Sequence, residues 1–338
     1  MVPALAVAGA LRAEGAAVTF IGGERAEAEL VPAAGYPLRT ISVEGLSRTN
    51  PLHAIRALAR AARATMDARS LLSELAPDAV MGGGGYVAGP VGVAALTRRV
   101  PLVLSEADSH LGLTNRVLAP LARRVCLSFP IEGRHGSRYR VTGRPIPTLG
   151  VERESARERF GIDPGELCVL VFGGSLGART INQAALGAFT SGIFHVLHVC
   201  GRRDYAELVT RPLPAGYDLR EYLDIDEFTE ALVASDLVVA RAGGSVFEIA
   251  GHGLPAILVP YPHASADHQS TNARWMSRAG AAIVIEDTQL SAARLAREVA
   301  QLLANPMRLA AMASASRRLA RPDAACEIAA ELLQAAGR

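Results

Sequence analysis

Short apolar runs recur along the chain, and most of them end at glycine before an alanine-rich stretch with helical periodicity. Runs that are apolar at every position, rather than at alternate positions, are typical of parallel strands buried on both faces. Nine such runs predict strands: 17–23, 78–85, 101–108, 124–129, 167–174, 194–201, 236–244, 255–262 and 281–287. Strands that alternate with helices in this way predict an α/β fold with doubly wound parallel sheets.

A charged, proline-containing segment at 144–166 interrupts this alternation. Its three prolines and scarce apolar residues are typical of a domain junction, and 338 residues suffice for two hydrophobic cores. The sequence therefore predicts two doubly wound Rossmann-like domains that face a cleft, at 1–147 and 148–322. A final helix at 323–338 is expected to pack back across the junction.

The chain opens with MVPALAVAGALRAEG, which predicts a helix with Pro3 near its first turn, where a missing N–H costs nothing. A doubly wound domain normally opens with a strand and a glycine turn that lead into its first helix. Neither precedes the helix here, so we expect the first strand and its glycine turn to be missing from this domain.

Charge is nearly balanced, with 35 basic residues, all of them arginine, against 33 acidic residues. A general nucleic-acid-binding protein would carry a marked basic excess, so the composition argues against one. The four cysteines lie far apart without a CxxC pair, which indicates buried thiols rather than a disulfide framework or a zinc site. The uncharged stretch at 79–96 holds six glycines and a proline, which argues against a membrane span.

A glycine turn at 173–177, GGSLG, joins a buried strand to a helix. Glycines let a ligand approach the backbone, and the start of the helix directs free N–H groups at an anion. The spacing is not GxGxxG and no GK[ST] follows, which disfavours a dinucleotide and excludes a P-loop. A tight strand-to-helix turn without a ligand stays open as the alternative.

A second glycine turn, at 243–245, is followed by Glu248 in the first turn of a helix. The carboxylate could accept both hydroxyls of a ribose while the preceding N–H groups hold phosphate. A glutamate that only stabilises the helix dipole is the alternative.

Polar side chains also precede the next helix. Gln269 and Asn272 are three residues apart and would share one helix face, and their amides suit sugar hydroxyls. Helix capping is the alternative for Asp267, and a metal site that combines it with His263 and His268 is a weak one.

A third glycine turn lies in the first half of the chain, in GGGGYVAGP at 82–90. Such a turn could hold a second anionic ligand such as a diphosphate. The residues predicted to bind the acceptor are Gly83, Gly84, Gly85 and Tyr86. By contrast, the DxD sequence at 224–226 fits a helix capping box formed by Asp224 and Glu227 better than a metal site.

Together these motifs resemble those of the MurG family, whose members are N-acetylglucosaminyltransferases with the two-domain GT-B fold. The likeness spans nearly the whole chain and includes the opening helix, GLTN at 112–115 and the segment 241–273. It implies that UDP-GlcNAc binds to the C-terminal domain and a lipid acceptor to the N-terminal domain. The donor-binding residues that it implies are Ser175, Leu223, Gly244, Ser245, Val246, Phe247, Glu248, Gln269 and Asn272.

Three departures from the family pattern affect the site. Family members begin with a strand and a GGTxGH turn before the opening helix, and this sequence starts after that turn. Where they read HEQN, this chain has SEAD at 105–108, which makes Asp108 the candidate catalytic base. Where they read GNPVR, it has GRPIP at 143–147, and Arg144 is expected to replace the phosphate-facing arginine.

The resemblance implies transfer of GlcNAc from UDP-GlcNAc to undecaprenyl-pyrophosphoryl-MurNAc-pentapeptide, from lipid I to lipid II, in peptidoglycan synthesis. The reaction is expected to invert the anomeric carbon and to use no metal or other cofactor. Two alternatives stay open: a related transferase that glycosylates another lipid such as diacylglycerol, and a non-catalytic UDP-sugar-binding protein.

The segment 50–69 combines apolar residues near helical spacing with several arginines. This pattern is typical of a helix that lies on an anionic membrane surface, although an ordinary surface helix would show it too. Together with the resemblance, it predicts a peripheral protein on the cytoplasmic face of the bacterial cell membrane.

Overall fold

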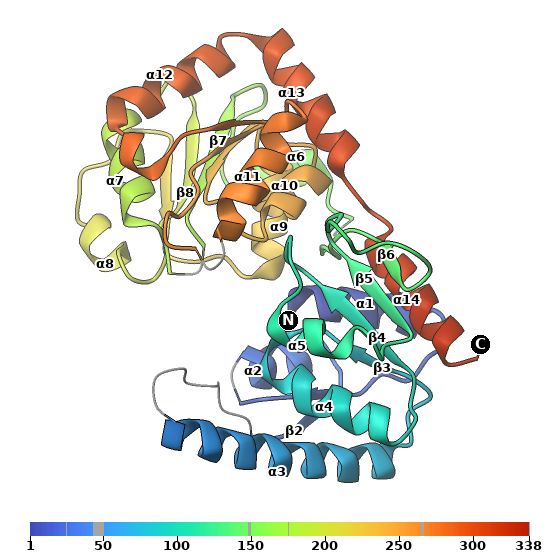
Figure 1. Cartoon of the computed structure of the whole chain (residues 1–338). Coiled ribbons are helices and arrows are strands. Elements are labelled where there is room, and N and C mark those ends of the chain that lie inside the picture. Colours follow the sequence, from blue (N-terminus) through green and yellow to red (C-terminus); the bar gives the residue numbers. More distant parts are fainter. Residues whose placement is uncertain (25, 43–50, 148–149, 175, 265–266, 338) are drawn as a thin grey trace. The chain divides into compact units, whose positions relative to one another are not determined.

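The computed structural model divides the chain into two compact units (Figure 1). The first unit comprises Met1–Ile146 and Arg321–Arg338, and the second comprises Pro147–Ala320. The structure describes all residues except 25, 43–50, 148–149, 175, 265–266 and 338, and it describes only the backbone at 26 and 51–59.

A six-stranded parallel sheet forms the centre of the second unit, in the order β12-β11-β10-β7-β8-β9. Its strands are β7 (Cys168–Phe172), β8 (His195–Val199), β9 (Tyr217–Arg220), β10 (Leu237–Ala240), β11 (Ala256–Leu258) and β12 (Ala282–Val284). After β7 the chain adds strands on one side as far as β9, and then it adds the rest on the other side, starting with β10. This is the strand order of a doubly wound dinucleotide-type fold, and its direction reverses between β7 and β10.

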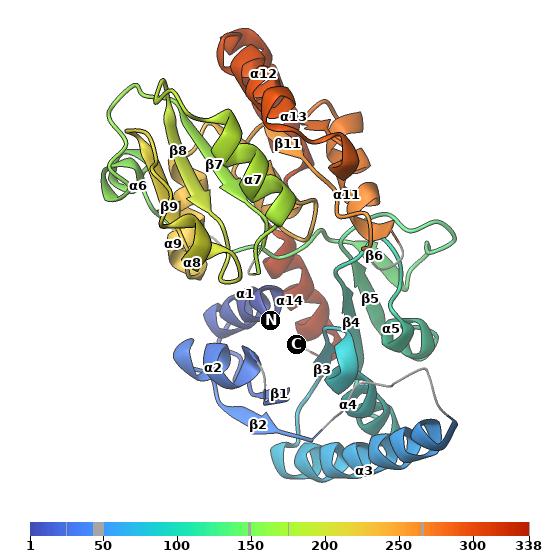
Figure 2. The same ribbon diagram turned by 90° about the vertical axis from the view of Figure 1, so that its left-hand side faces the viewer.

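Helices cover both faces of this sheet (Figure 2). They are α6 (Arg153–Arg159), α7 (Arg179–Ala188), α8 (Tyr205–Leu208), α9 (Ile225–Ala234), α10 (Val246–Gly251), α11 (His268–Arg278), α12 (Ala292–Leu303) and α13 (Pro306–Leu319), with a short 3-10 turn η2 (Asp287–Gln289). On one face, Ile181 of α7 and Leu295 of α12 pack in one buried cluster with Val171 and Val239 of the central strands. On the other face lie α6 and α9, which contact each other.

The first unit holds two separate parallel sheets. One pairs β1 (Phe20–Gly22) with β2 (Leu38–Thr40), and the other has the order β3 (Val80–Gly82), β4 (Leu102–Glu106), β5 (Arg124–Leu127), β6 (Tyr139–Val141). The helices of this unit are α1 (Val2–Ala13), α2 (Ala26–Ala33), α3 (Pro51–Leu75), α4 (Gly85–Thr97), α5 (Leu113–Leu118) and α14 (Ala324–Ala335). None of the helices that the structure describes is long and apolar enough to cross a membrane.

The C-terminal helix α14 is part of the core of the first unit. Its Ile328 and Leu332 are buried in a cluster with Val7 of α1, Val103 of β4 and Cys126 of β5. The opposite face of the four-stranded sheet is covered by α4 and by α3, which packs against α4.

A buried ion pair fastens α14 to the sheet. Glu331 is only 5% exposed, and it accepts hydrogen bonds from Arg124 of β5 and from Arg140 of β6, the latter at 2.8 Å. Burial alone would raise the pKa of Glu331, but the hydrogen bonds from Arg140 and Arg124 outweigh it and hold that pKa below its usual value. Glu331 is therefore charged and fully paired at neutral pH.

Several local predictions are confirmed by the structure. Each of the nine predicted runs contains a strand, all strand pairs are parallel, and the opening helix has its proline near the first turn. Asp224 and Glu227 form the expected capping box at the start of α9. Three strands, β2, β6 and β9, were not predicted.

Candidate functional site

The two glycine turns of the second unit lie at the point where its strand order reverses. Phe172 at the end of β7 is paired with Ala240 at the end of β10, so the turns 173–177 and 241–245 leave the sheet side by side. In open doubly wound sheets, ligands bind in the crevice at this switch point, beyond the carboxyl ends of the strands. The topology therefore makes this edge the candidate ligand site.

Close backbone packing holds the first turn in place. A Cβ atom at Gly177 would lie 1.9 Å from the carbonyl oxygen of Cys200, at the end of β8, and Gly177 has a φ of +79°. Only glycine fits here without displacing backbone. The turn is thereby fixed immediately before α7, which begins at Arg179. Ser175, predicted to contact the donor, lies outside the described residues.

A buried polar network holds the Cys200 carbonyl in position through a hydrogen bond. Asn182 of α7 donates to this carbonyl at 2.9 Å and to Asp204 at 3.0 Å. Its side-chain oxygen lies 3.1 Å from Nε2 of His198, whose Nδ1 lies 2.7 Å from the hydroxyl of Tyr217. Since Asn182 Oδ1 can only accept, Nε2 of His198 carries the proton and Nδ1 accepts from Tyr217. The network links α7 to β8 and β9.

Two different effects determine the charges of Asp204 and His198 in this network. Asp204 accepts hydrogen bonds from Arg203, Arg179 and Asn182, which lower its pKa to about 2. Burial alone lowers the pKa of His198 to about 3, because a protonated ring would be charged inside the core. The carboxylate is charged and the imidazole neutral at physiological pH.

The neutral state of His198 makes the stability of the second unit depend on pH. In the unfolded chain a histidine has a pKa of about 6.5, so between pH 6.5 and 3 the unfolded state binds one proton more than the folded state. We expect His198 to make unfolding easier by about 1.4 kcal/mol for each pH unit below 6. The variant His198→Gln should lose this part of the slope in urea unfolding between pH 6.5 and 4.5. The exposed His135, changed to Gln as a control, should leave the slope as in the parent, and an equal slope in all three proteins would contradict the assignment.

Arg241 joins the second turn to three other elements. It is 9% exposed and donates to the carbonyls of Val259 and Pro260 at 3.1 and 3.2 Å. It also donates to Asp287 at 2.6 Å and to the hydroxyl of Thr180 at 2.8 Å, and that hydroxyl donates to Asp287 at 2.7 Å. The ends of β10 and β11, the start of α7 and η2 are thus held in one arrangement.

The second turn leads directly into the predicted ribose-binding helix. Ser245 is the N-cap of α10 and makes no capping hydrogen bond through its side chain. Val246 and Phe247 are buried, with Phe247 packed on Trp275 at a ring distance of 5.2 Å. Glu248 is half-buried in the first turn of α10, and Gly244 precedes the N-cap. The structure therefore brings these residues together at the switch point.

Gln269 and Asn272 both lie in α11 but differ in their surroundings. The side-chain oxygen of Gln269 accepts the N–H of Tyr261 at 2.9 Å, which leaves its NH₂ group to donate elsewhere. Asn272 is 3% exposed and donates to the carbonyls of Ala242 and Gly243 at 3.0 and 3.3 Å. Gln269 thus presents a donor near the end of β11, whereas Asn272 holds the second glycine turn.

Leu223 and its neighbour follow strand β9. Leu223 is 6% exposed, whereas Tyr222 is 43% exposed. The guanidinium of Arg202 lies 4.6 Å from the centre of the Tyr222 ring. Leu223 is thus a buried apolar residue at this sheet edge, just before the helix that Asp224 caps.

In the first unit, the glycine turn after β3 is tied to α5. Gly84 and Gly85 have φ values of +80° and +77°, and the carbonyl of Gly85 accepts the hydroxyl of Thr114 at 3.1 Å. Gly83 precedes this turn, and Tyr86 after it is 58% exposed. The predicted acceptor-binding residues are therefore gathered at the carboxyl end of β3.

Glu106 organises the adjoining loop at the end of β4. Its buried carboxylate accepts the N–H groups of Asp108 at 3.1 Å and Gly112 at 2.9 Å, and the amide of Asn115 at 2.9 Å. Asp108 is exposed in this loop. Arg144 is half-buried elsewhere in the same unit, near the amino group of Met1. The described residues contain no cluster of three or more metal-binding side chains.

Both units match known domains of one enzyme class. Residues 1–127 match the glycosyltransferase family 28 N-terminal domain, and residues 168–328 match the glycosyltransferase family 28 C-terminal domain. CalG4, the calicheamicin glycosyltransferase, shares the fold with a TM-score of 0.70, 18% identity and coverage of 99% of this chain and 95% of its own. Fold and matches together define a family 28 glycosyltransferase with two doubly wound α/β domains.

Relatives over almost the full length define the family more closely. Proteins of Moorella thermoacetica and Halothermothrix orenii, both named UDP-N-acetylglucosamine–N-acetylmuramyl-(pentapeptide) pyrophosphoryl-undecaprenol N-acetylglucosamine transferase, are 42% and 35% identical. Each alignment covers 95% of this chain, with 92% and 91% of the relative. The crystal structure of Acinetobacter baumannii MurG has a TM-score of 0.76 and 28% identity, and it covers 98% of this chain and 95% of its own. The chain belongs to the MurG family.

Sequence reasoning missed three groups of supporting residues: Arg241, Glu106 and the His198–Asn182–Asp204 network. The sequence contained one signal for Arg241 and Glu106. Each ends a buried apolar strand, in LVVAR and LVLSE, and a charged side chain in such a place needs several hydrogen-bonding partners. Those partners come from distant parts of the chain, so their identity could not be read from the sequence.

Proposed function

We propose that the protein transfers GlcNAc from UDP-GlcNAc to undecaprenyl-pyrophosphoryl-MurNAc-pentapeptide and so converts lipid I to lipid II. The observation that carries this proposal is the 42% identity, over 95% of the chain, to a relative named for that reaction. The switch-point turns of the second unit support it, because they place two glycine-rich helix starts and Glu248 at one edge of the sheet.

In the proposed reaction, an acceptor hydroxyl oxygen forms a bond to the anomeric carbon while the bond from that carbon to the diphosphate breaks. UDP leaves with the bonding electrons, and the configuration inverts. The backbone N–H groups of the turns at 173–177 and 243–246 would stabilise the charge that grows on the diphosphate. Glu248 would accept the ribose hydroxyls, Leu223 would contact the uracil, and Gln269 would donate to GlcNAc. Asn272 would act indirectly by holding the second turn.

Asp108 is the proposed acceptor of the hydroxyl proton. Its loop is held by Glu106, and its side chain is exposed at the same sheet edge as the turn at 83–86. A base must reach the attacking hydroxyl within hydrogen-bonding distance. The acceptor would therefore lie between this loop and that turn. Arg144 is proposed to bind the UDP-GlcNAc donor through its phosphate, in place of the arginine of the family pattern.

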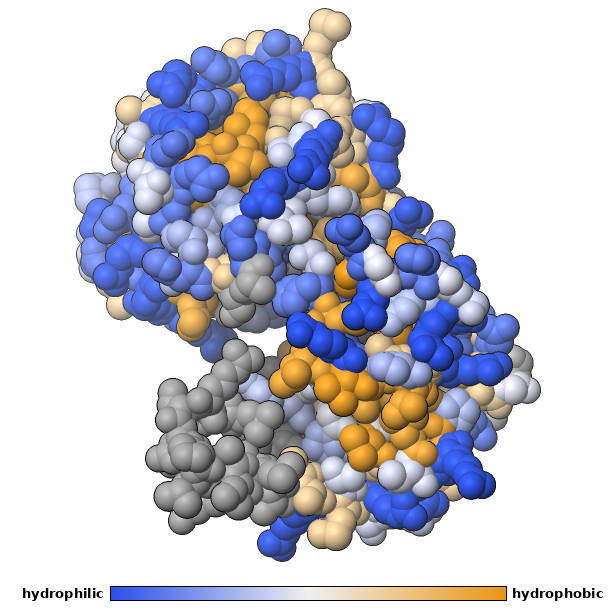
Figure 3. All heavy atoms as spheres, in the orientation of Figure 1, coloured by the Kyte–Doolittle hydropathy of each residue, from blue (hydrophilic) through white to orange (hydrophobic). Residues whose placement is uncertain are grey.

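An exposed apolar surface on α5 supports membrane association. Leu113, Val117 and Leu121 are 57–68% exposed and are spaced four residues apart, so they line one side of α5 and the turn after it. The exposed Arg116 and Arg123 lie beside them. Figure 3 shows apolar side chains gathered over α5 and α4. We propose that this surface, next to the acceptor loops, rests on an anionic membrane on its cytoplasmic face. The side chains at 51–59, part of the membrane-binding segment predicted from the sequence, lie outside the described residues.

The direct test is transfer of radiolabelled GlcNAc from UDP-GlcNAc to the lipid-linked MurNAc-pentapeptide, scored as labelled disaccharide. Parallel reactions contain diacylglycerol or no acceptor. Product with the muramyl acceptor alone supports the proposal. Product with diacylglycerol alone, or tight UDP-GlcNAc binding without product, would overturn it.

Glu248→Ala tests the donor site without the acceptor. Loss of two charge-assisted hydrogen bonds should weaken UDP binding by at least about tenfold in calorimetry. Gln269→Ala should bind UDP as the parent does but lose its preference for UDP-GlcNAc over UDP. Glu154→Ala removes a glutamate that also lies in the first turn of a helix, α6, but is exposed, and should change neither value. Parent-like UDP affinity in Glu248→Ala would remove the ribose assignment.

A further inference from the structure

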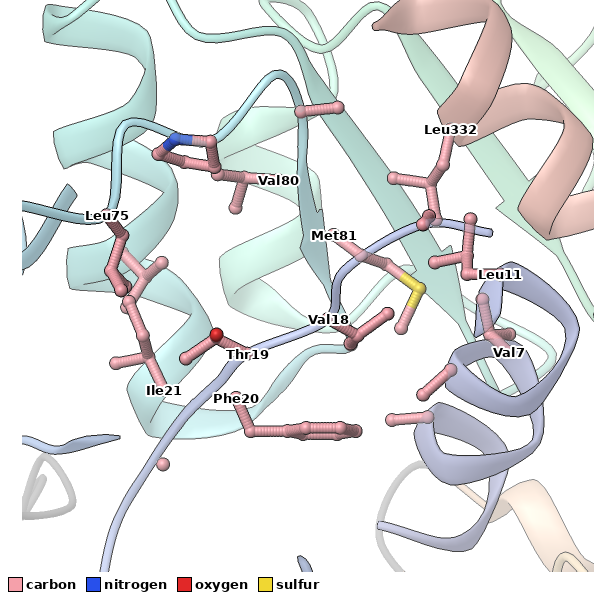
Figure 4. Close-up of a pocket in the computed structure, with 18 of the residues that line it drawn as sticks. Val7, Leu11, Val18, Thr19, Phe20, Ile21, Leu75, Val80, Met81 and Leu332 are labelled. Atoms are coloured by element: carbon pink, nitrogen blue, oxygen red, sulfur yellow. The ribbon is translucent and has the colours of Figure 1, made fainter. Parts of the chain in front are cut away.

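Two features of the structure have no part in the proposed reaction so far. One is a cavity of about 510 Å³ in the first unit, whose labelled side chains are apolar except for Thr19 (Figure 4). A lining of this kind does not select a particular ligand. The other is a cluster of three polar side chains in the second unit, which adjoins both glycine turns of the proposed donor site.

The three side chains of this cluster come from distant parts of the second unit. Arg241 follows β10, Thr180 lies in the first turn of α7, and Asp287 is the first residue of η2. Arg241 donates to Asp287 at 2.6 Å and to the Thr180 hydroxyl at 2.8 Å, and this hydroxyl donates to Asp287 at 2.7 Å. We call them the Arg241 triad, because their hydrogen bonds form a closed ring around the guanidinium.

Packed residues lie on both sides of Asp287 in the chain. Ile285 precedes it and Leu295 of α12 follows it, and both are fully buried in the cluster that also contains Ile181 of α7. Closely packed residues of this kind move little. The carboxylate of Asp287 is therefore a fixed point, against which the longer side chain of Arg241 is held.

The ion pair of the triad is largely shielded from solvent. The side chains of Arg241 and Asp287 are 11% and 16% exposed, and the guanidinium lies 5.4 Å from the centre of the Tyr261 ring. Water and salt screen such a pair only weakly, and loss of one partner leaves the other charge buried without compensation. The arrangement of the triad is thus strongly preferred over alternatives in which Arg241 points elsewhere.

The triad links the two glycine turns. Arg241 is followed directly by the second turn, and Thr180 is three residues beyond Gly177 of the first turn. Gly177 packs against the carbonyl of Cys200, so α7 starts from a turn that is already fixed on one side. Since the hydrogen bonds of the triad join Thr180 to Arg241, they set the distance between the two turns.

The contacts of Arg241 favour this indirect role over direct contact with a phosphate. Its Nη1 lies within hydrogen-bonding distance of Asp287 and of the carbonyls of Val259 and Pro260, and its Nη2 donates to Thr180. The carboxylate also neutralises its charge. An arginine that binds phosphate would instead direct a fork of donors and an unpaired charge at the ligand.

We infer that Asp287 is a positioning residue for donor binding, which acts through Arg241 and Thr180 to hold the two glycine turns at the spacing that a diphosphate requires. This role rests on the proposed function, because it presumes that UDP binds at these turns. Backbone N–H groups that are fixed before the ligand arrives stabilise its charge without reorganisation. Asp287 would not contact the donor itself.

The test compares UDP with UMP in calorimetry. Asp287→Ala should weaken UDP binding at least about fivefold, because the turns lose their fixed spacing. UMP has a single phosphate and does not need both turns, so its affinity should change less than about twofold. Asp287→Asn keeps the oxygen Oδ1, to which both Arg241 and Thr180 donate, and should restore most of the affinity for UDP.

Asp236→Ala is the matched control. Asp236 pairs with Arg153, also at 2.6 Å, and it directly precedes β10, so the two ion pairs lie at opposite ends of one strand. Both alanine variants should unfold at a lower urea concentration than the parent, but Asp236→Ala should bind UDP and UMP as the parent does. Thr180→Val removes only an exposed hydroxyl from the triad, so it is the milder variant should Asp287→Ala not fold, and it should weaken UDP binding about threefold.

Three results would overturn the positioning role of Asp287: parent-like UDP affinity in the folded triad variants, an equal loss of affinity in Asp236→Ala, or equal losses for UDP and UMP. Each is separable from failure of the proposed reaction. If the parent transfers GlcNAc while the triad variants bind UDP as it does, only the positioning role fails. If the expected UDP and UMP affinities are found but the parent transfers no GlcNAc, only the proposed reaction fails.

Discussion

Replacing Gly177 by alanine should disrupt the proposed donor site. The new Cβ would lie 1.9 Å from the carbonyl oxygen of Cys200, whereas real contacts of this kind are not shorter than 3.0 Å, so backbone must move by about 1 Å. The φ of +79° adds strain for any residue with a Cβ. We expect a loss of about 3 kcal/mol in the free energy of unfolding and a fall of about a hundredfold in transfer activity, because the turn that we propose to bind phosphate is displaced.

The matched control is Gly165→Ala. Gly165 also has a positive φ, of +85°, but a Cβ built there meets nothing within 4 Å. It should lose only about 1 kcal/mol in urea unfolding and keep full affinity for UDP. If both variants unfold at the same urea concentration and bind UDP equally, the contact between the turn and β8 does not support the site.

Replacing Glu331 by glutamine should destabilise the first unit by about 3 kcal/mol. The change leaves the shape of the side chain but removes the charge that pairs with Arg124 and Arg140, and Arg124 is then left partly buried without a counter-ion. Thermal unfolding of the whole protein should show the transition of the first unit at a lower temperature, with that of the second unit unchanged.

Glu327→Gln is the control on the same helix. Glu327 is 32% exposed and, among the residues that the structure describes, forms an ion pair with Arg140 alone, at 3.2 Å, so its loss should cost less than about 1 kcal/mol. Equal effects of the two substitutions would show that burial of the Glu331 pair contributes nothing beyond an ordinary surface ion pair.

The sequence predicted the strands that lie in a continuous apolar run, including β3 and β12 at the ends of their sheets, and missed three edge strands with polar residues. β2, β6 and β9 read LRT, YRV and YDLR, and each lies at the end of its sheet. An edge strand needs only one partner and tolerates polar residues, so these three strands lack the continuous apolar run by which the other strands were recognised.

The candidate site was predictable only in part, because sequence patterns show local features and not contacts between distant residues. Glycine turns at strand ends and an acid in the next helix are local patterns, and the fold brings them to one edge. The role of Asn272 depended on three-dimensional contacts instead. Its amide looked suited to a sugar, but it lies buried against the carbonyls of Ala242 and Gly243. The spacing of the residues predicted the helix that carries Asn272, but it could not show that this side of the helix packs against the second glycine turn.

The placement of α14 has a consequence for biosynthesis. The ribosome makes the described strands of the first unit before the second unit, yet helix α14, which is part of the same core, is translated after the whole of the second unit. The second unit is a continuous stretch and can finish folding while the first still exposes the face of Val103 and Cys126. The nascent chain must therefore keep this apolar surface from aggregating until α14 emerges from the ribosome.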